Sequence, residues 1–117
     1  MDFFCYDQQG CRMLQKRLED YDEAKGINCD FKAALVQAVA PFFADLMVDQ
    51  FGNYLSQKIF EVANLEELEL ITDIIKPCLV DISMNVHGTR AVQTLVEVLS
   101  KNVVPAEGIL TSVISYL

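Results

Sequence analysis

The chain has 117 residues, of which 52% are apolar, so it is long enough for one domain with a modest core and too apolar for a disordered segment. Its net charge of −8 argues against a nucleic-acid partner when only the sum is considered. No uninterrupted apolar run reaches the roughly 18 residues of a membrane span, and the first residues show no signal-peptide pattern. The four cysteines form no Cys-x-x-Cys pair and His87 has no cysteine near it. We therefore expect reduced thiols, no metal site, no cofactor and a cytoplasmic protein.

The first third of the chain is predicted to hold two helices separated by a loop. Residues 11–18 place Met13, Leu14 and Leu18 at helical spacing, which predicts a helix with these side chains on one face. Residues 19–30 are polar and contain a glycine, which indicates a loop. The other predicted elements here are the end of a helix over 1–6 and a helix over 30–40 that buries Phe31, Ala34, Leu35, Ala38 and Val39.

Two prolines divide the rest of the chain into units of similar plan. Pro41 and Pro77 lie 36 residues apart. Each is expected in the first turn of a short helix, over 42–48 or 78–84, where its missing N–H has no cost. A glycine-containing turn and a longer helix follow in each unit. The last helix of the chain is predicted to begin near Pro105 and to run to residue 117.

The middle unit shows the plan in detail. Its second helix is predicted from about Asn53 to Val62, with Leu55, Ile59 and Phe60 facing inward. Asn64 is expected to cap the third helix, with Glu67 as its capping-box partner. That third helix is predicted to bury Leu68, Ile71, Ile74 and Ile75 and to expose an acidic face made of Glu66, Glu67, Glu69 and Asp73.

One degenerate motif recurs in three copies and relates these units. Each copy has a glycine, at position 10, 52 or 88, and a glutamine five residues later. The glycines lie 42 and then 36 residues apart, and such self-similarity is typical of repeat architectures. The pattern predicts an all-α solenoid of about three three-helix repeats with truncated ends, in which stacked repeats bury one another's apolar faces. The expected boundaries of repeats one, two and three are about 1–40, 41–76 and 77–117.

The motif helices place groups suited to the edge and to the face of a base side by side. Asn53 and Gln57 are four residues apart and share a helix face, with Tyr54 beside them. Amides bond the edge of an unstacked base, while aromatic rings and guanidinium planes stack on its face. The corresponding sets in the other repeats are Cys11 and Gln15 with Arg12, and Thr89 and Gln93 with Arg90.

Basic side chains gather in the same three segments. The windows 11–18, 53–60 and 89–96 contain no carboxylate. We expect them to form a basic stripe on an acidic molecule, with Lys16 and Lys58 supporting a phosphate backbone. The basic residues of the stripe are Arg12, Lys16, Arg17, Lys58 and Arg90. No Ser/His/Asp set, Cys/His pair or phosphate loop is present in the sequence, so we do not expect an enzyme.

The chain resembles the Pumilio (PUF) RNA-binding repeats. The resemblance rests on the 36-residue period, on the first helices that begin with proline, and on the segments GCRMLQK, GNYLSQK and GTRAVQT. Their order is similar to the first three repeats of a fungal-like Pumilio homology domain. The resemblance implies a right-handed solenoid in which each repeat reads one base. It assigns adenine to the Cys11 repeat, uracil to the Asn53 repeat and adenine to the Thr89 repeat, which gives 5′-AUA-3′ on an antiparallel RNA.

The resemblance also implies a biological role. It predicts binding to the 3′ untranslated regions of mRNA, repression or decay of the targets, and corepressor or deadenylase proteins as partners, with no DNA or membrane partner. From the residues alone, other interpretations stay open. The same face or an exposed repeat end could serve a protein-interaction solenoid, for a peptide or for a second copy of the chain. At single positions, Cys11 could be a buried structural thiol, Tyr54 a core aromatic, and the arginines and glutamines ordinary exposed residues.

Overall fold

A computed structural model describes residues 6–101 and 103–117, and all regular elements in these residues are helices. The predicted helix end over 1–6 lies outside the described residues except for Tyr6. Two short 3-10 helices, η1 (Ala40–Phe42) and η2 (Lys76–Cys78), contain the two prolines. The α-helices are α2 (Gln8–Glu19), α3 (Cys29–Val39), α4 (Phe43–Val48), α5 (Gly52–Val62), α6 (Leu65–Ile75), α7 (Leu79–Met84), α8 (Gly88–Lys101) and α9 (Val103–Ser115).

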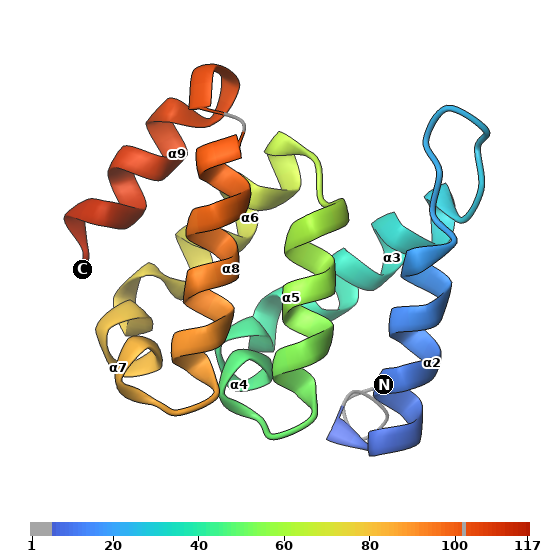
Figure 1. Cartoon of the computed structure of the whole chain (residues 1–117), viewed down its shortest axis with the longest axis horizontal. Helices are drawn as coiled ribbons and strands as arrows, with labels where there is room; N and C mark the ends of the chain where they lie inside the picture. The colour runs from blue at the N-terminus through green and yellow to red at the C-terminus, as the bar shows by residue number, and fades with distance from the viewer. Residues whose placement is uncertain (1–5, 102) are drawn as a thin grey trace.

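The helices that carry the motif form one layer. Helices α2, α5 and α8 lie side by side and begin at the same end of the molecule (Figure 1). Helix α5 packs against α2 on one side and against α8 on the other. Helices α3 and α6 lie behind this layer, α9 lies beside α8 at one flank, and the short helices α4 and α7 lie at the end where the motif helices begin (Figure 1). The all-α solenoid predicted from the repeats is confirmed.

The prolines have the same place in the two units, as predicted. Pro41 and Pro77 each stand in the first turn of a 3-10 helix that continues into α4 or α7. In this position the missing N–H leaves no donor unpaired, and the fixed φ of proline suits the turn. The short helices follow within one residue of the expected bounds. Between α2 and α3, Gly26 and Asn28 adopt positive φ angles of 68° and 58°, consistent with the predicted loop.

The core lies between the two layers, and its composition corrects several sequence-based assignments. Leu14 and Leu18 are buried as predicted, but Met13 is 59% exposed because α2 turns the face of Cys11, Leu14 and Leu18 inward. In α3 the alanines at 34 and 38 are exposed and Val36 is buried. Helical periodicity alone is compatible with burial of either face of these helices. Packing against neighbouring repeats determines which face is buried. The predicted inward residues of α5 and α6 are buried, except that Ile74 is only partly so.

A buried ion pair joins the first and second repeats. The Lys32 ammonium in α3 contacts the Glu67 carboxylate in α6, and both side chains are buried. Glu67 also accepts the Asn64 N–H at 2.9 Å, while Asn64 Oδ1 accepts the Glu67 N–H at 2.8 Å, so the predicted capping box is confirmed. The prediction that Glu67 belongs to a solvent-exposed acidic face is wrong. Its carboxylate is shielded because Lys32 crosses from the neighbouring repeat.

The segment Cys29–Val48 is long and apolar enough, by length and composition only, to cross a membrane. In the structure it is not one straight helix, because η1 with Pro41 separates α3 from α4. Eight of its residues, from Lys32 to Met47, are buried in the solenoid, and a core helix passes the same test.

Candidate nucleic-acid interface

Each motif helix starts from the same local device, which the sequence analysis did not recognise. An Asp or Asn three residues before the motif glycine accepts the glycine N–H. The three acceptors and their N···O distances are Asp7 (2.8 Å), Asp49 (2.7 Å) and Asn85 (3.0 Å). These side chains satisfy helix N–H groups that have no partner within the helix. Since the device recurs, the three motif glycines lie at equivalent places near the starts of α2, α5 and α8, and so do the motif residues that follow them.

The glycines are needed for close approach rather than for a turn conformation. Gly52 and Gly88 are the first residues of α5 and α8, and neither has a positive φ. A Cβ on Gly52 would lie 2.9 Å from the carbonyl oxygen of Leu46, and one on Gly88 would lie 2.1 Å from that of Ile82. The missing side chain therefore lets α5 sit directly on α4 and α8 directly on α7. Our prediction that these glycines supply the turn is corrected accordingly.

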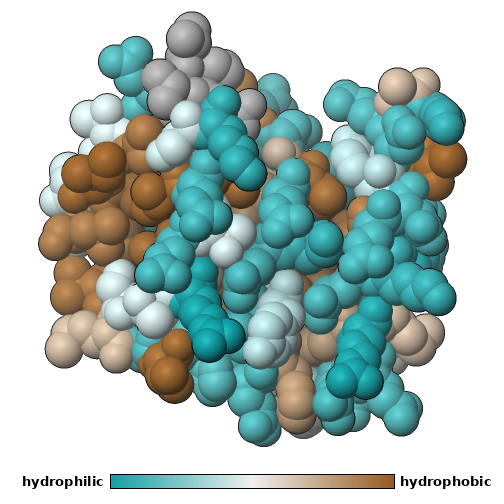
Figure 2. All heavy atoms as spheres, viewed as in Figure 1, coloured by the Kyte–Doolittle hydropathy of each residue, from teal (hydrophilic) through white to brown (hydrophobic). Residues whose placement is uncertain are grey.

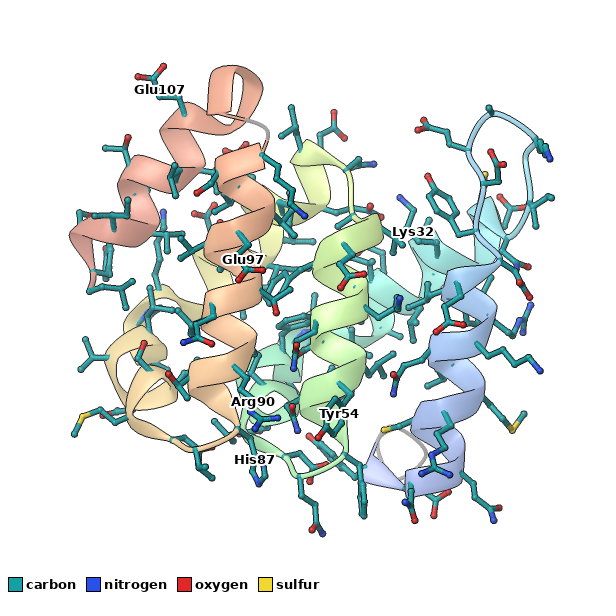
Figure 3. The ribbon with its side chains drawn as sticks, in the orientation of Figure 1. Lys32, Tyr54, His87, Arg90, Glu97 and Glu107 are labelled. Atoms are coloured by element: carbon teal, nitrogen blue, oxygen red, sulfur yellow. The ribbon has the colours of Figure 1, made fainter. Side chains whose placement is uncertain are left out.

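We use the term motif face for the exposed side of α2, α5 and α8. Hydrophilic side chains cover these three helices (Figure 2). Tyr54 is 49% exposed, so the interpretation as a core aromatic is wrong. Tyr54 and Arg90 project from the first turns of α5 and α8, while Glu97 lies further along α8 (Figure 3). The other predicted residues on this face with exposed or partly exposed side chains are Arg12, Gln15, Lys16, Gln57, Lys58, Thr89 and Gln93.

Two predicted base-edge residues are buried. Cys11 is 2% exposed and Asn53 is 1% exposed. Cys11 nevertheless lines a surface hollow of about 410 Å³ between α2 and α5. Asn53 is held differently, because its Nδ2 donates to the carbonyl oxygens of Asp49 at 2.8 Å and Gln50 at 3.1 Å. The base-edge role predicted for Asn53 requires an accessible side chain, and an exposed position on the helix face is not what the structure shows.

The hollow between α2 and α5 brings together predicted residues from two repeats. Arg12 and Tyr54, the predicted stacking residues of repeats one and two, both line it. Cys11 and Gln15, the predicted edge residues of repeat one, line it as well. The remaining lining residues are Gln8, Gln50 and Phe51. A planar ligand in this hollow would meet a guanidinium, a phenol ring and an amide.

A polar chain connects repeats two and three. The Gln57 Nε2 donates to Asn53 Oδ1 at 3.1 Å, and the Thr94 hydroxyl donates to Gln57 Oε1 at 3.0 Å. Thr94 stands six residues after its motif glycine, where Lys16 and Lys58 stand in the other repeats. The sequence analysis missed Thr94. That departure from the pattern of the other two copies is the signal that could have found it.

The basic stripe is narrower than the sequence indicated. The Lys58 ammonium contacts the carboxylates of Glu19 at 3.9 Å and Glu61 at 3.4 Å, and the Arg17 guanidinium lies 4.0 Å from the centroid of the Phe31 ring. Within the described part of the chain, Arg12, Lys16 and Arg90 have no ion pair. An acidic row, Glu19, Glu61 and Glu97, follows each motif glycine by nine residues and is exposed.

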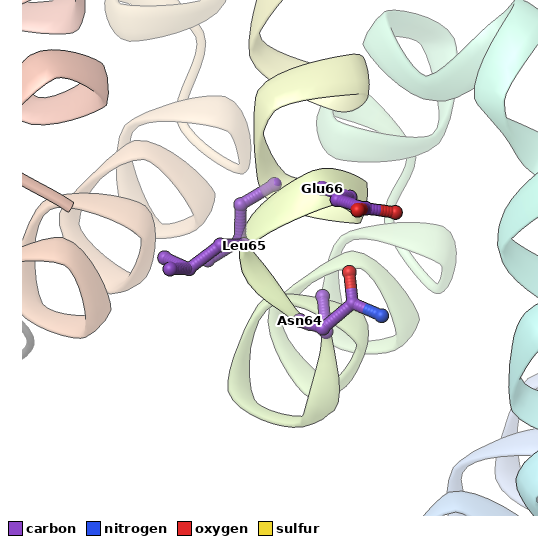
Figure 4. Close-up of a pocket in the computed structure, with 5 residues that line it drawn as sticks. Asn64, Leu65 and Glu66 are labelled. Carbon is purple, nitrogen blue, oxygen red and sulfur yellow. The ribbon is translucent and has the colours of Figure 1, made fainter. Parts of the chain in front are cut away.

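Another hollow, of about 560 Å³, lies at the turn between α5 and α6 (Figure 4). Its lining is Ala63, Asn64, Leu65, Glu66 and Leu68. The Asn64 side chain is already used by the capping box. This hollow therefore offers little directed chemistry beyond one exposed carboxylate. Across the described residues, no group of three or more His, Cys, Asp and Glu side chains could hold a metal ion.

The repeat geometry agrees with comparisons to known proteins. The model of the Pumilio-family RNA-binding repeat matches residues 4–24, 42–76 and 78–103. The chain belongs to the Pumilio family. The second matched segment spans α4 to α6, and the third spans α7 and α8. The family resemblance read from the three motifs is thereby confirmed, and Pumilio repeats are binding modules rather than catalytic ones.

Curated relatives of this Pumilio chain include proteins of two yeasts and of Arabidopsis thaliana. It is 45% identical over 97 residues to Pumilio domain-containing protein C6G9.14 of Schizosaccharomyces pombe, covering 83% of this chain and 13% of that protein. It is 37% identical over 97 residues to Suppressor protein MPT5 of Saccharomyces cerevisiae, covering 83% of this chain and 11% of that protein. The chain thus spans only a small part of the length of these relatives.

Solved Pumilio structures share the fold. The RNA-binding domain of yeast Puf5p bound to SMX2 RNA is similar with a TM-score of 0.72 and 37% identity, over 81% of this chain and 25% of that one. The Puf4 RNA-binding domain bound to the HO endonuclease RNA 3′ UTR recognition sequence is similar with a TM-score of 0.70 and 38% identity, over 86% of this chain and 31% of that one. Both are RNA complexes.

Proposed function

We propose that this Pumilio chain binds single-stranded RNA through its motif face and reads 5′-AUA-3′ with one base per repeat. The main observation in support is the hollow between α2 and α5, because Arg12 and Tyr54 line it together with Cys11 and Gln15. Guanidinium and aromatic planes stack on bases while polar side chains bond their edges. The relatives with solved structures support the same use, since both are described as bound to RNA.

Each repeat has a proposed role for its motif residues. Cys11 and Gln15 read adenine, Asn53 and Gln57 serve the uracil site, and Thr89 and Gln93 read adenine. Arg12, Tyr54 and Arg90 stack on the bases. Lys16 supports the phosphate backbone, and Lys58 does so to a smaller degree because two carboxylates already neutralise its ammonium.

The proposed biological role follows from this RNA binding. We propose recognition of mRNA 3′ untranslated regions in the cytoplasm, followed by repression or decay of the bound mRNA. Corepressor or deadenylase proteins would be the partners that carry out the second step. The support is family membership together with a relative described in complex with a 3′ UTR recognition sequence.

The test compares one stacking residue with a matched tyrosine elsewhere. Tyr54 and Tyr116 are both 49% exposed, but Tyr116 lies beyond α9 and away from the motif helices. Tyr54→Ala should weaken binding of an RNA that contains 5′-AUA-3′ by roughly 5- to 150-fold, the equivalent of 1–3 kcal/mol for one stacked base. Tyr116→Ala should leave binding unchanged. Fluorescence anisotropy with a scrambled RNA as competitor measures both, and equal losses in the two variants would contradict the proposal.

A second candidate function is self-association through the surface made by α7 and α9. Apolar surface gathers beside α8 on this flank (Figure 2). Met84 is 81% exposed and Val86 is 72% exposed, and further exposed apolar residues there are Val80, Ile114, Tyr116 and Leu117. Contiguous exposed apolar surface often marks an interface. A second copy of this chain is the proposed occupant.

A further inference from the structure

The amide of Gln57 is held at both ends by groups of opposite hydrogen-bonding character. Its Nε2 donates to Asn53 Oδ1, and its Oε1 accepts the hydroxyl of Thr94 from the next repeat. Gln57 is only partly buried, whereas Asn53 is almost completely so. One end of this amide is therefore anchored inside repeat two and the other end on repeat three.

Backbone carbonyls determine the direction of the whole chain of hydrogen bonds. The carbonyl oxygens of Asp49 and Gln50 can only accept, so the Asn53 atom facing them must be its NH₂ group. Asn53 Oδ1 consequently faces Gln57, and only the NH₂ group of Gln57 can bond to it. The opposite orientation of the Gln57 amide would place two carbonyl oxygens against each other. The Gln57 carbonyl therefore points to Thr94.

Among the described residues, the oriented amide keeps one donor and one acceptor free for a ligand. An NH₂ group has two hydrogens and a carbonyl oxygen has two acceptor positions, and the chain uses one of each on Gln57. Uracil presents the carbonyl acceptor O4 beside the donor N3–H, which this arrangement can match. Cytosine presents the donor N4–H₂ beside the acceptor N3, so it can be matched only by an inverted amide. A glutamine without these restraints could rotate its side-chain amide by half a turn, which exchanges the NH₂ group and the oxygen, and could then bind either uracil or cytosine.

We propose that Asn53 and Thr94 are positioning residues that lock the Gln57 amide, so that repeat two prefers uracil to cytosine. Asn53 sets the polarity of the amide, and Thr94 holds its oxygen end in place. Base selection by repeat two thus depends on a side chain in repeat three that no motif position assigns to base reading. This inference rests on the proposed function, because it concerns the uracil site of the same RNA-binding face.

The decisive variant is Thr94→Val, which removes the hydroxyl and nearly keeps the shape of the side chain. The full chain is titrated with two short RNAs that differ only in the middle base, 5′-AUA-3′ or 5′-ACA-3′, in competition binding. The uracil-to-cytosine preference should fall roughly 3- to 10-fold, the contribution of about one hydrogen bond. Thr94→Ser, which retains the hydroxyl, should keep the preference within about twofold. Thr111→Val, the same change at an exposed threonine of α9, is the matched control.

A double-mutant cycle checks that Thr94 acts through Gln57. In a chain that carries Gln57→Leu, the additional change Thr94→Val should have no further effect on base preference, because the locked group is absent. Side-chain NH₂ signals in a nitrogen-15 NMR spectrum give a readout without RNA. The Gln57 NH₂ group should exchange with water faster in Thr94→Val than in Thr94→Ser, whereas a mainly structural role would slow or speed many amides together.

The outcomes separate this inference from the proposed function. The proposed lock is overturned, and the proposed function is not, if Thr94→Val leaves the uracil preference unchanged. The same holds if Thr94→Val lowers this preference equally in the unsubstituted chain and in the Gln57→Leu chain. Equal affinity of the unsubstituted chain for both RNAs and for a scrambled RNA overturns the proposed function and the lock with it. If Thr94→Val lowers the preference only at the middle base, and Thr94→Ser retains it, the result supports both the proposed function and the lock.

Discussion

At the scale of single residues, Asn53 shows how one motif position can serve the fold and the site together. Its NH₂ group bonds to the carbonyls of Asp49 and Gln50, and its oxygen orients Gln57. Replacing Asn53 therefore removes hydrogen bonds inside the first turn of α5 as well as a support of the uracil site. A buried group left without a partner costs about 1–3 kcal/mol, more than an exposed helix position would.

The base preference of repeat two should change when both amides are exchanged together. A carboxylate only accepts hydrogen bonds, so Gln57→Glu favours guanine, whose N1–H and N2–H₂ both donate. Alone, this change would set the new carboxylate against Asn53 Oδ1, and Asn53→Ser replaces that oxygen with a hydroxyl that can donate. We expect the double variant to prefer guanine at the middle base of 5′-AUA-3′ in competition binding.

This exchange also has an expected cost in stability. Because Asn53 is buried, the double variant should lose about 1–2 kcal/mol in free energy of unfolding by urea denaturation. Gln93→Glu, at an exposed position of α8, should stay within about 0.5 kcal/mol of the unsubstituted chain. A double variant that still prefers uracil would show that Asn53 and Gln57 do not determine the base.

At the scale of elements, the contacts of α5 with α4 and of α8 with α7 depend on glycine. Gly88→Ala would place a Cβ 2.1 Å from the Ile82 carbonyl oxygen, so α8 would have to move away from α7. We expect a loss of about 1–3 kcal/mol in free energy of unfolding, as for an overpacked core. Gly108→Ala is the matched control, because no atom of the described residues lies within 4 Å of its Cβ position in α9. That change should stabilise the chain by about 0.5–1 kcal/mol in the same urea experiment, since alanine favours helix.

The buried ion pair between α3 and α6 gives a second prediction at this scale. Lys32→Met leaves the Glu67 carboxylate buried without its cation and should cost about 3–5 kcal/mol in free energy of unfolding. Adding Glu67→Gln removes the charge and should restore part of the loss, because an amide can still accept the Asn64 N–H. The comparison of the single and double variants by urea denaturation measures the coupling. Purely additive losses would indicate that the two side chains do not stabilise each other.

At the scale of the whole molecule, the charge of −8 limits how RNA can be bound. Only Arg12, Lys16 and Arg90 of the predicted stripe are free of ion pairs or ring contacts in the described residues, and the acidic row lies on the same helices. Neutralising three phosphates of a single strand predicts a slope of about −2 for log K against log salt concentration. Anisotropy titrations across a range of salt concentrations measure this slope. A slope of about −8 or steeper would contradict binding dominated by stacking and base edges.

Self-association is the second prediction for the whole molecule. If a second copy covers α7 and α9, light scattering should report a dimer whose population rises with protein concentration. Met84→Glu places a charge in the most exposed part of this surface and should shift the population to monomer. Met13→Glu, at an exposed methionine of α2 outside this surface, should leave the dimer unchanged. A monomer at all concentrations without substitution would rule out this candidate function.

The sequence by itself determined the repeat period, the helical class and the family, because these depend on local patterns. Pro41 and Pro77 start short helices through their fixed φ, and Asn64 with Glu67 forms a capping box within four residues of chain. The three motifs recur with the same internal spacing. Helical geometry is therefore sufficient to place Arg12, Tyr54 and Arg90 at equivalent positions on their helices. None of these features needs a contact between distant residues.

Only the tertiary structure decided which side chains are buried and which are held by a neighbouring repeat. The exposure of Met13 and the burial of Val36 differ from prediction. Each helix has two partly apolar faces, and the face that packs against neighbouring helices is the one that becomes buried. Lys32 and Glu67 meet across 35 residues of chain, and Gln57 and Thr94 across 37. Such pairs follow from the packing of one repeat on the next, and no periodicity within a repeat records them. The orientation of the Gln57 amide, on which the uracil site depends, is therefore a property of the stacked repeats.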